Sequence, residues 1–126
     1  MITSAGPGEG KSTVVANLAR IIAKSQRRVI VVDSDLRLPS LHKVFHLPND
    51  TGLTSILKRE ATLEEALQLS SIPGVLVLTS GPVSTGPAEL LGTPQILCRC
   101  RAPATDRFQQ MDRGKPILSV TRCALL

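Results

Sequence analysis

The feature that most constrains this chain is a glycine-rich loop at its start, Met1-Ile-Thr-Ser-Ala-Gly-Pro-Gly-Glu-Gly-Lys-Ser-Thr13, which runs directly into an apolar, helix-like stretch. Glycines adopt positive φ angles without steric cost and let backbone N–H groups approach an anion closely. A helix that begins after such a loop points the positive end of its dipole at the same anion. The loop therefore predicts a binding site for phosphate groups.

The loop matches a relaxed form of the pattern G-x-x-x-x-G-K-S/T, with Ala5 where the pattern has its first glycine. In that pattern the lysine, here Lys11, reaches the β and γ phosphates of a nucleotide, and the next hydroxyl, here Ser12, ligates Mg²⁺. The dinucleotide fingerprint G-x-G-x-x-G does not fit, because counting from Gly6 puts Lys11 at its third glycine. A nucleotide phosphate site is favoured over an ordinary glycine-rich turn.

A second candidate site follows the apolar run Val29–Val32. Four consecutive β-branched residues predict a strand of a parallel sheet that is buried on both faces. If extended geometry continues beyond this strand, Asp33, Asp35 and Arg37 point the same way. Carboxylates at the carboxyl end of such a strand lie where open α/β sheets bind ligands. We therefore expect Asp33 and Asp35 to bind Mg²⁺ or act in catalysis; helix capping in a solvated loop is the alternative.

The other patterns alternate between helix and strand. Residues 11–26 predict a helix that packs against a sheet, because apolar residues cover most of its circumference. A second buried strand is expected over Val75–Leu78. Shorter helices are expected over Leu41–Leu47, over Leu53–Lys58, over Thr62–Leu69 and from Pro87 onward. This order predicts the α/β class, a doubly wound parallel sheet of P-loop NTPase type with three α/β/α layers. We expect it to be incomplete at both ends, because Met1–Ser4 supplies only the end of a strand.

Composition limits the function. Residues 1–95 carry nine basic and eight acidic side chains, whereas residues 96–126 carry six and two, so most of the net charge of +5 lies in the tail. No series of aromatic residues accompanies this charge, so nucleic-acid binding is not expected. Three late cysteines, Cys98, Cys100 and Cys123, suit a reducing cytoplasm better than a disulfide framework or a zinc site. His42 and His46 are spaced i, i+4, but without a third ligand we expect an exposed pair.

Four segments follow one another within residues 1–95: S-A-G-P-G-E-G-K-S-T, V-V-D-S-D-L-R-L-P-S-L-H-K-V-F, L-P-N-D-T-G-L-T and L-T-S-G-P-V-S-T-G-P-A-E-L-L-G-T-P. Together they resemble the bacterial tyrosine kinases, cytoplasmic P-loop domains that act with a membrane polysaccharide co-polymerase in capsule and exopolysaccharide synthesis. The resemblance implies transfer of phosphate from Mg-ATP to protein tyrosines. It also implies a membrane activator as partner, a location at the inner face of the membrane and an oligomeric assembly.

The resemblance implies a role for each residue of the site. Backbone N–H groups of Gly6, Gly8, Glu9, Gly10 and Lys11 would hold the phosphates, together with the Lys11 ammonium. Ser12 would bind Mg²⁺, and Thr13 would contact the α phosphate. Asp33 would support Mg²⁺, and Asp35 would assist the attacking hydroxyl. The catalytic residues would be these two aspartates and Lys11. Arg37 would bind the same ligand or a neighbouring subunit. Such a set suits phosphoryl transfer, which depends on positioning and charge neutralisation.

Two other functions stay open. The partitioning and septum-site ATPases have a related fold but usually carry lysine at the position of Gly6. A catalytically inactive nucleotide-binding fragment is the other alternative, because two features of the kinases are missing. The chain contains no tyrosine, and its late apolar run Ile117–Val120 is followed by Thr121 and Arg122 rather than by an acidic residue. We expect residues 96–126 to be a basic tail outside a nucleotide-binding domain of residues 1–95, either translated in a shifted frame or a genuine extension.

Overall fold

A computed structural model of the protein describes residues 10–83 and 117–122. In chain order its elements are α1 (Lys11–Lys24), β1 (Arg28–Asp33), α2 (Leu41–Phe45), α3 (Leu53–Leu57), α4 (Leu63–Ala66), β2 (Leu67–Leu69), β3 (Val75–Leu78) and β4 (Ile117–Arg122). The expected strand end at Met1–Ser4, the helix from Pro87 and the three cysteines lie outside the described residues. Of the described helices, none is long and apolar enough to span a membrane.

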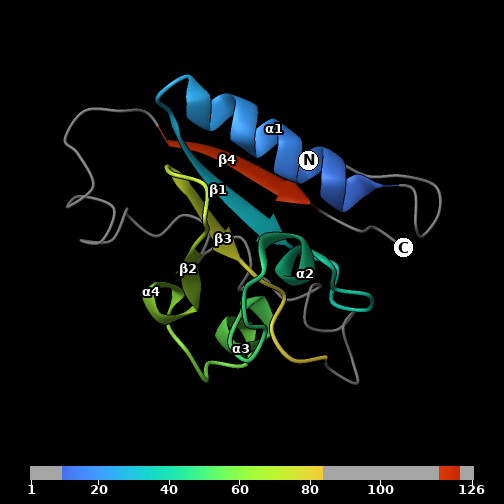
Figure 1. The fold of residues 1–126 in the computed structure, drawn as a ribbon. Helices are drawn as coiled ribbons and strands as arrows, with labels where there is room; N and C mark the ends of the chain where they lie inside the picture. Colours follow the sequence, from blue (N-terminus) through green and yellow to red (C-terminus); the bar gives the residue numbers. More distant parts are fainter. Residues whose placement is uncertain (1–9, 84–116, 123–126) are drawn as a thin grey trace.

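The strands form a four-stranded sheet in the order β2-β3-β1-β4 (Figure 1). β1 is one of the two inner strands and pairs in parallel with both neighbours, so that Val31 is opposite Val77 of β3 and Val120 of β4. β2 pairs antiparallel with β3, with Leu67 opposite Leu78. The α/β class is confirmed by this arrangement. The sheet is mixed rather than wholly parallel, because β2 runs in the opposite direction.

β4 comes from the segment expected to be a basic tail. All six of its residues pair with β1, from Ile117 opposite Arg28 to Arg122 opposite Asp33. β1 therefore has hydrogen-bonded partners along both edges. The strand beside β1 thus ends in Thr121 and Arg122 and supplies no acidic residue next to Asp33.

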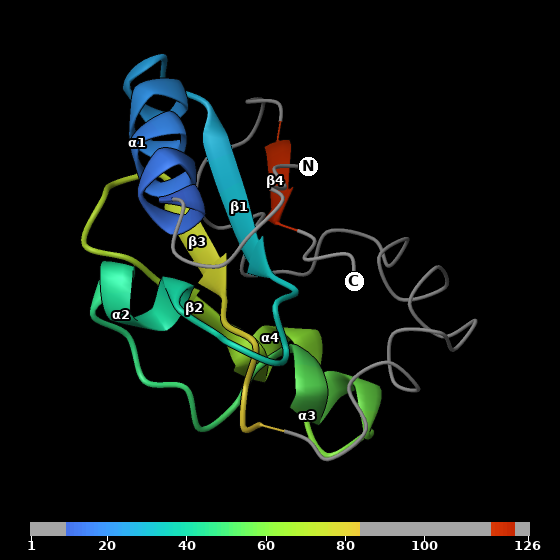
Figure 2. The same ribbon diagram turned by 90° about the vertical axis from the view of Figure 1, so that its right-hand side faces the viewer.

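Helix α1 covers one face of the sheet (Figure 2). Its buried residues Val15 and Ala19 pack against the sheet in the main core cluster. The other members of this cluster are Val29, Val31, Leu41, Phe45, Val75 and Val77. Helix α2 belongs to the same core, so it is fixed close to the carboxyl end of β1 (Figure 1). Burial of each aliphatic side chain contributes about 1.5–3 kcal/mol, which makes this cluster the main support of the site.

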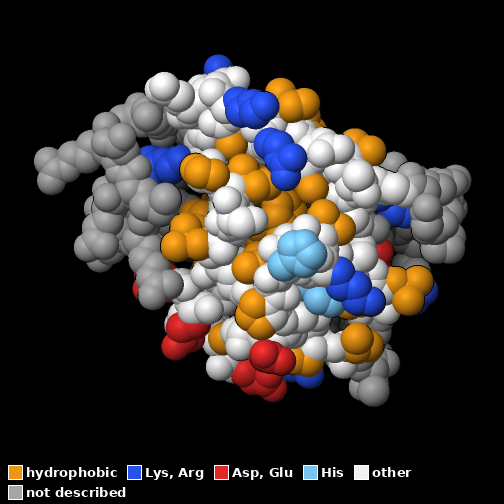
Figure 3. All heavy atoms as spheres, in the orientation of Figure 1, with side chains coloured by type: hydrophobic (Ala, Val, Ile, Leu, Met, Phe, Trp, Pro, Cys, Tyr) orange, Lys and Arg blue, Asp and Glu red, His pale blue; other side chains and the backbone are white. Residues whose placement is uncertain are grey.

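Two burial predictions are wrong. In β1 only Val29, Val31 and Asp33 are buried, and the alternate residues on the opposite face are partly exposed. In α1 the apolar residues do not bury most of the circumference, because Val14, Leu18 and Ile21 are 53%, 37% and 63% exposed. Their i, i+4, i+7 spacing puts them on one side of the helix, and Figure 3 shows hydrophobic side chains at this surface of the molecule.

The helix expected over Thr62–Leu69 is shorter than predicted. Its capping box forms, because the Thr62 hydroxyl accepts a hydrogen bond from the Glu65 N–H and the Glu65 carboxylate accepts one from the Thr62 N–H. The helix nevertheless ends at Ala66, and the last part of the predicted helix is the strand β2. Pairing with the edge of β3 satisfies the backbone groups of this strand, a long-range contact that local helix signals do not report.

Candidate functional site

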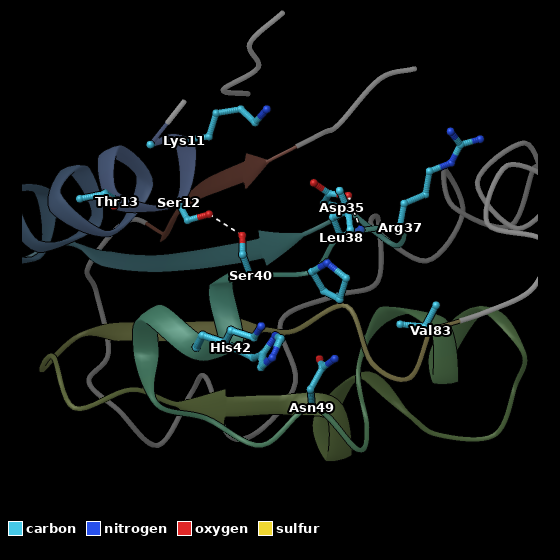
Figure 4. A pocket seen from close by; sticks show the side chains of 13 residues that line it. Lys11, Ser12, Thr13, Asp35, Arg37, Leu38, Ser40, His42, Asn49 and Val83 are labelled. Atoms are coloured by element: carbon cyan, nitrogen blue, oxygen red, sulfur yellow. Dashed lines mark hydrogen bonds between the residues drawn. The ribbon is translucent and has the colours of Figure 1, made fainter. Parts of the chain in front are cut away.

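The start of α1 and the end of β1 meet at a pocket of about 760 Å³ (Figure 4). Its lining comes from the first turn of α1, from the loop after β1, from α2 and from two more distant segments. The lining residues are Gly10, Lys11, Ser12, Thr13, Asp35, Arg37, Leu38, Pro39, Ser40, His42, Lys43, Asn49 and Val83. Small-molecule sites commonly have volumes of about 300–1,000 Å³, so the pocket is large enough for a nucleotide.

The first turn of α1 presents backbone donors to the pocket. Gly10 is its N-cap residue with a φ of 76°, and as a glycine it has no side chain to cap the helix. The helical ladder starts with the bond from Val14 N–H to the Gly10 carbonyl oxygen, at 3.0 Å. Because a helix N-terminus carries a partial positive charge and amide donors, this end suits an anion. Gly10, Lys11, Ser12 and Thr13 thus lie together at the pocket; the predicted Gly6, Gly8 and Glu9 lie outside the described residues.

Asp33 is fully buried and is not among the lining residues. Its Oδ1 accepts a hydrogen bond from the Asp35 N–H at 3.2 Å, and its Oδ2 accepts from the Ser40 N–H at 3.3 Å and the Leu41 N–H at 3.0 Å. The carboxylate therefore folds the loop after β1 and caps the start of α2. Such contacts are typical of helix capping, the alternative to Mg²⁺ binding that the sequence left open for Asp33.

Asp35 and Arg37 do line the pocket. Asp35 Oδ1 accepts a hydrogen bond from the Leu38 N–H at 3.0 Å, and the Leu36 N–H bonds to the Ser34 carbonyl oxygen at 3.1 Å. These bonds turn the chain immediately after β1, so the extended geometry ends at Asp33. The same direction was expected for Asp33, Asp35 and Arg37 only if extended geometry continued, and this condition is not met.

Ser40 is a pocket residue that the sequence did not single out. Its Oγ lies 2.6 Å from Ser12 Oγ, a hydrogen bond between α1 and the loop after β1 (Figure 4). Ser40 is also the N-cap residue of α2, yet its side chain makes no capping hydrogen bond there. In the sequence, Ser40 stands between a proline and a helical pattern, which is typical of an N-cap. That pattern does not indicate a contact with the phosphate loop.

His42 and Asn49 line the other side of the pocket. The expectation of an exposed histidine pair is wrong for His42, which is half-buried, although His46 is exposed. Within the described part of the chain, His42 Nδ1 has no hydrogen-bond partner. Both histidine side chains lie over α2 on the face shown in Figure 3. Among the described residues, no group of three metal-binding side chains is present.

The charges around the pocket suit a polyanion. Its described lining carries the cations Lys11, Arg37 and Lys43, and Asp35 is its one carboxylate. Figure 4 shows the Lys11 side chain extending from the start of α1 in the direction of the loop that carries Asp35. Cations at a concave surface raise the local concentration of an anionic ligand. The arrangement is suited to bind phosphate groups and to place them beside one carboxylate.

Comparison with known proteins agrees with this geometry. The profile of the family described as the CobQ/CobB/MinD/ParA nucleotide binding domain matches residues 1–102. Among curated proteins, the tyrosine-protein kinase YwqD of Bacillus subtilis (strain 168) is 50% identical over 93 residues, which are 74% of this chain and 39% of that protein. This chain therefore spans well under half of that relative.

Solved structures show the same fold. The kinase domain of the Escherichia coli tyrosine kinase ETK matches with a TM-score of 0.75 at 30% identity, over 96% of this chain and 45% of that chain. The septum site-determining protein MinD of Pyrococcus horikoshii OT3, complexed with Mg-ADP, matches with a TM-score of 0.67 at 24% identity, over 99% of this chain and 51% of that chain. The second likeness shows the fold alone.

Proposed function

The chain belongs to the CobQ/CobB/MinD/ParA family of nucleotide-binding domains, and we propose that its pocket binds Mg-ATP as part of a protein tyrosine kinase of capsule or exopolysaccharide synthesis. One observation carries the proposal: the first turn of α1 and the Asp35–Ser40 loop line the same pocket. The identity to YwqD and to the ETK kinase domain supports the kinase branch over the septum-site ATPases.

The phosphates would lie against the first turn of α1. Backbone N–H groups at Gly10–Thr13 and the Lys11 ammonium would neutralise their charge, with Gly6, Gly8 and Glu9 completing the loop and Thr13 at the α phosphate. Without the lysine ammonium, the negative charge of the phosphates would no longer be neutralised by a side chain of the loop. Lys11 is therefore the residue on which nucleotide affinity should depend most.

The residues present also fit a divalent cation. Mg²⁺ prefers hard oxygen ligands, and Ser12 Oγ supplies one at the pocket. When bound, the ion would neutralise charge on the nucleotide phosphates. Asp33, buried behind the loop, would support the ion by fixing the Ser40 N–H rather than by contact with the pocket.

Asp35 would accept the proton of the attacking hydroxyl. It is the carboxylate of the pocket lining and is held in place by the Leu38 N–H. Arg37, from the same loop, would bind the acceptor or a neighbouring subunit. Since residues 1–126 contain no tyrosine, the acceptor tyrosine would lie outside them. A membrane polysaccharide co-polymerase as activator, and a cytoplasmic location at the membrane surface, belong to the same proposal.

The test is an assay with radiolabelled ATP, Mg²⁺ and a copolymer of glutamate and tyrosine as acceptor. A kinase gives phosphotyrosine on the copolymer, and Asp35→Asn abolishes it while ATP binding remains. The absence of tyrosine from the chain means that self-phosphorylation cannot produce this signal. Release of phosphate without phosphotyrosine would select the ATPase function of the partitioning and septum-site proteins. Neither product, with ATP still bound, would select the inactive fragment.

A further inference from the structure

The Ser40 side chain makes a different bond from the one its position favours. A serine at an N-cap ordinarily accepts a hydrogen bond from an N–H of the first helical turn. Ser40 is the N-cap of α2 but makes no such bond. The carboxylate of Asp33 takes over this role, since it accepts from the Ser40 and Leu41 N–H groups. The Ser40 hydroxyl is thereby left to bond to Ser12 across the pocket.

From this exchange of partners we infer that Ser40 is a positioning residue for a divalent cation bound by Ser12, an inference that rests on the proposed function. A hydroxyl has one proton to donate and two lone pairs to offer. If Ser12 donates its proton to Ser40 Oγ, 2.6 Å away, the Ser12 lone pairs point elsewhere and can ligate the ion. A cation at Ser12 favours this direction of the bond, because its charge repels a proton that faces it and makes the Ser12 hydroxyl a stronger donor.

The position of Ser40 is itself fixed. Its N–H is held by Asp33, which is fully buried at the end of β1, an inner strand of the sheet. The bond to Ser12 then ties the first turn of α1 to this loop. A chain of contacts therefore runs from the sheet through Asp33 and Ser40 to Ser12. Groups that orient a metal ligand in this way typically change metal affinity by about 10- to 100-fold when they are removed.

The experiment is titration calorimetry of ATP into the full chain, in EDTA and at a series of Mg²⁺ concentrations. Relative to its own ATP affinity in EDTA, Ser40→Ala should need about tenfold more Mg²⁺ than the wild type for the same gain in affinity. Ser40→Thr keeps a hydroxyl and should restore the wild-type Mg²⁺ requirement. Ser71→Ala, an exposed serine that does not line the pocket, is the matched control and should behave as the wild type.

A double-mutant cycle shows whether Ser40 acts through Ser12. In the Ser12→Ala background, Ser40→Ala should cause no further increase in the Mg²⁺ requirement. Effects that multiply would overturn the inference, and so would an unchanged Mg²⁺ requirement in Ser40→Ala, or an equal loss of affinity with and without the ion. If the wild type bound no ATP under any condition, the proposed function would fail and this inference with it. A failure confined to Ser40 leaves wild-type Mg-ATP binding intact, so the two failures are distinguishable.

Discussion

Asn49 and Gly81 are joined by a pair of hydrogen bonds at the edge of the pocket. Asn49 Nδ2 donates to the Gly81 carbonyl oxygen at 2.8 Å, and its Oδ1 accepts from the Gly81 N–H at 2.9 Å. Asn49 precedes α3 and also lines the pocket, whereas Gly81 follows β3. One amide side chain thus fixes the loop after β3 to the segment that closes the far side of the pocket.

Replacing Asn49 by Ala should lower the free energy of unfolding by roughly 1–3 kcal/mol, because it leaves the N–H and carbonyl groups of the buried Gly81 without these partners. Urea unfolding followed by far-ultraviolet circular dichroism measures this, since the chain has neither Trp nor Tyr. Asp50→Ala, at the exposed neighbouring residue, is the control and should change stability by less than about 0.5 kcal/mol. Equal effects of the two substitutions would contradict the role of Asn49.

Gly81→Ala and Gly74→Ala form a matched pair of substitutions that measures how much an added side chain destabilises the protein. Both have positive φ, 80° and 82°, so Ala at either position costs about 1–2 kcal/mol of backbone strain. A Cβ on Gly81 would also overlap Thr54 Oγ1, whereas one on Gly74 would make ordinary contact with the Arg27 carbonyl oxygen at 3.5 Å. Gly81→Ala should therefore be clearly the more destabilising in thermal unfolding. A larger loss for Gly74→Ala would show that the loop after β3 is not held against Thr54.

The two aspartates should separate into a structural and a chemical role. Asp33→Asn puts an amide N–H₂ against backbone N–H donors, so we expect a loss of roughly 1–3 kcal/mol in unfolding free energy. Asp35→Asn keeps an oxygen for the Leu38 N–H and should cost less than about 1 kcal/mol. Denaturation of the two variants in parallel measures this difference. A more stable Asp33→Asn than Asp35→Asn protein would be incompatible with the capping contacts.

Glu65 Oε2 accepts a hydrogen bond from the Thr62 N–H at 2.8 Å and another from the Thr62 hydroxyl at 2.9 Å. These bonds, the backbone one most strongly, lower the pKa of the Glu65 carboxyl below its ordinary value of 4.5. A pKa lowered by folding means that the ionised carboxylate stabilises α4 above the unfolded-state pKa. This contribution is lost as the pH falls through the folded-state pKa. An NMR titration of the Glu65 carboxyl should show the lowered pKa, and Thr62→Ala should raise it only in part, because the backbone donor remains. A wild-type pKa at or above 4.5 would contradict the capping box.

Much of the fold follows from local patterns. The starts of α1, β1 and β3 were predicted to the residue or within one residue, because a glycine-rich loop and apolar runs report them directly. The end of the helix at Ala66 and the strand β2 were not, because Leu67-Gln68-Leu69 fits a helix turn or a strand equally well. Only pairing with β3 decides between them.

The sequence predicted which segments line the pocket better than it predicted the contacts between them. Gly10–Thr13 and Asp35 lie at the pocket as expected. Asp33 does not, because the chain turns directly after β1, and this turn depends on backbone bonds that a periodicity argument cannot see. Ser40 and Asn49 were missed because each works through a partner about 30 residues away in the sequence, Ser12 and Gly81 respectively. Long-range pairs of this kind leave no spacing pattern.

The central claim is that the start of α1 binds the phosphates of a nucleotide. Titration calorimetry of Mg-ATP into the full chain, with Lys11→Ala as the matched variant, tests it most directly. We predict saturable binding by the wild type and a loss of at least tenfold in affinity for Lys11→Ala, with unchanged thermal unfolding. Binding of equal strength by both proteins, or no binding by a folded wild type, would contradict the claim.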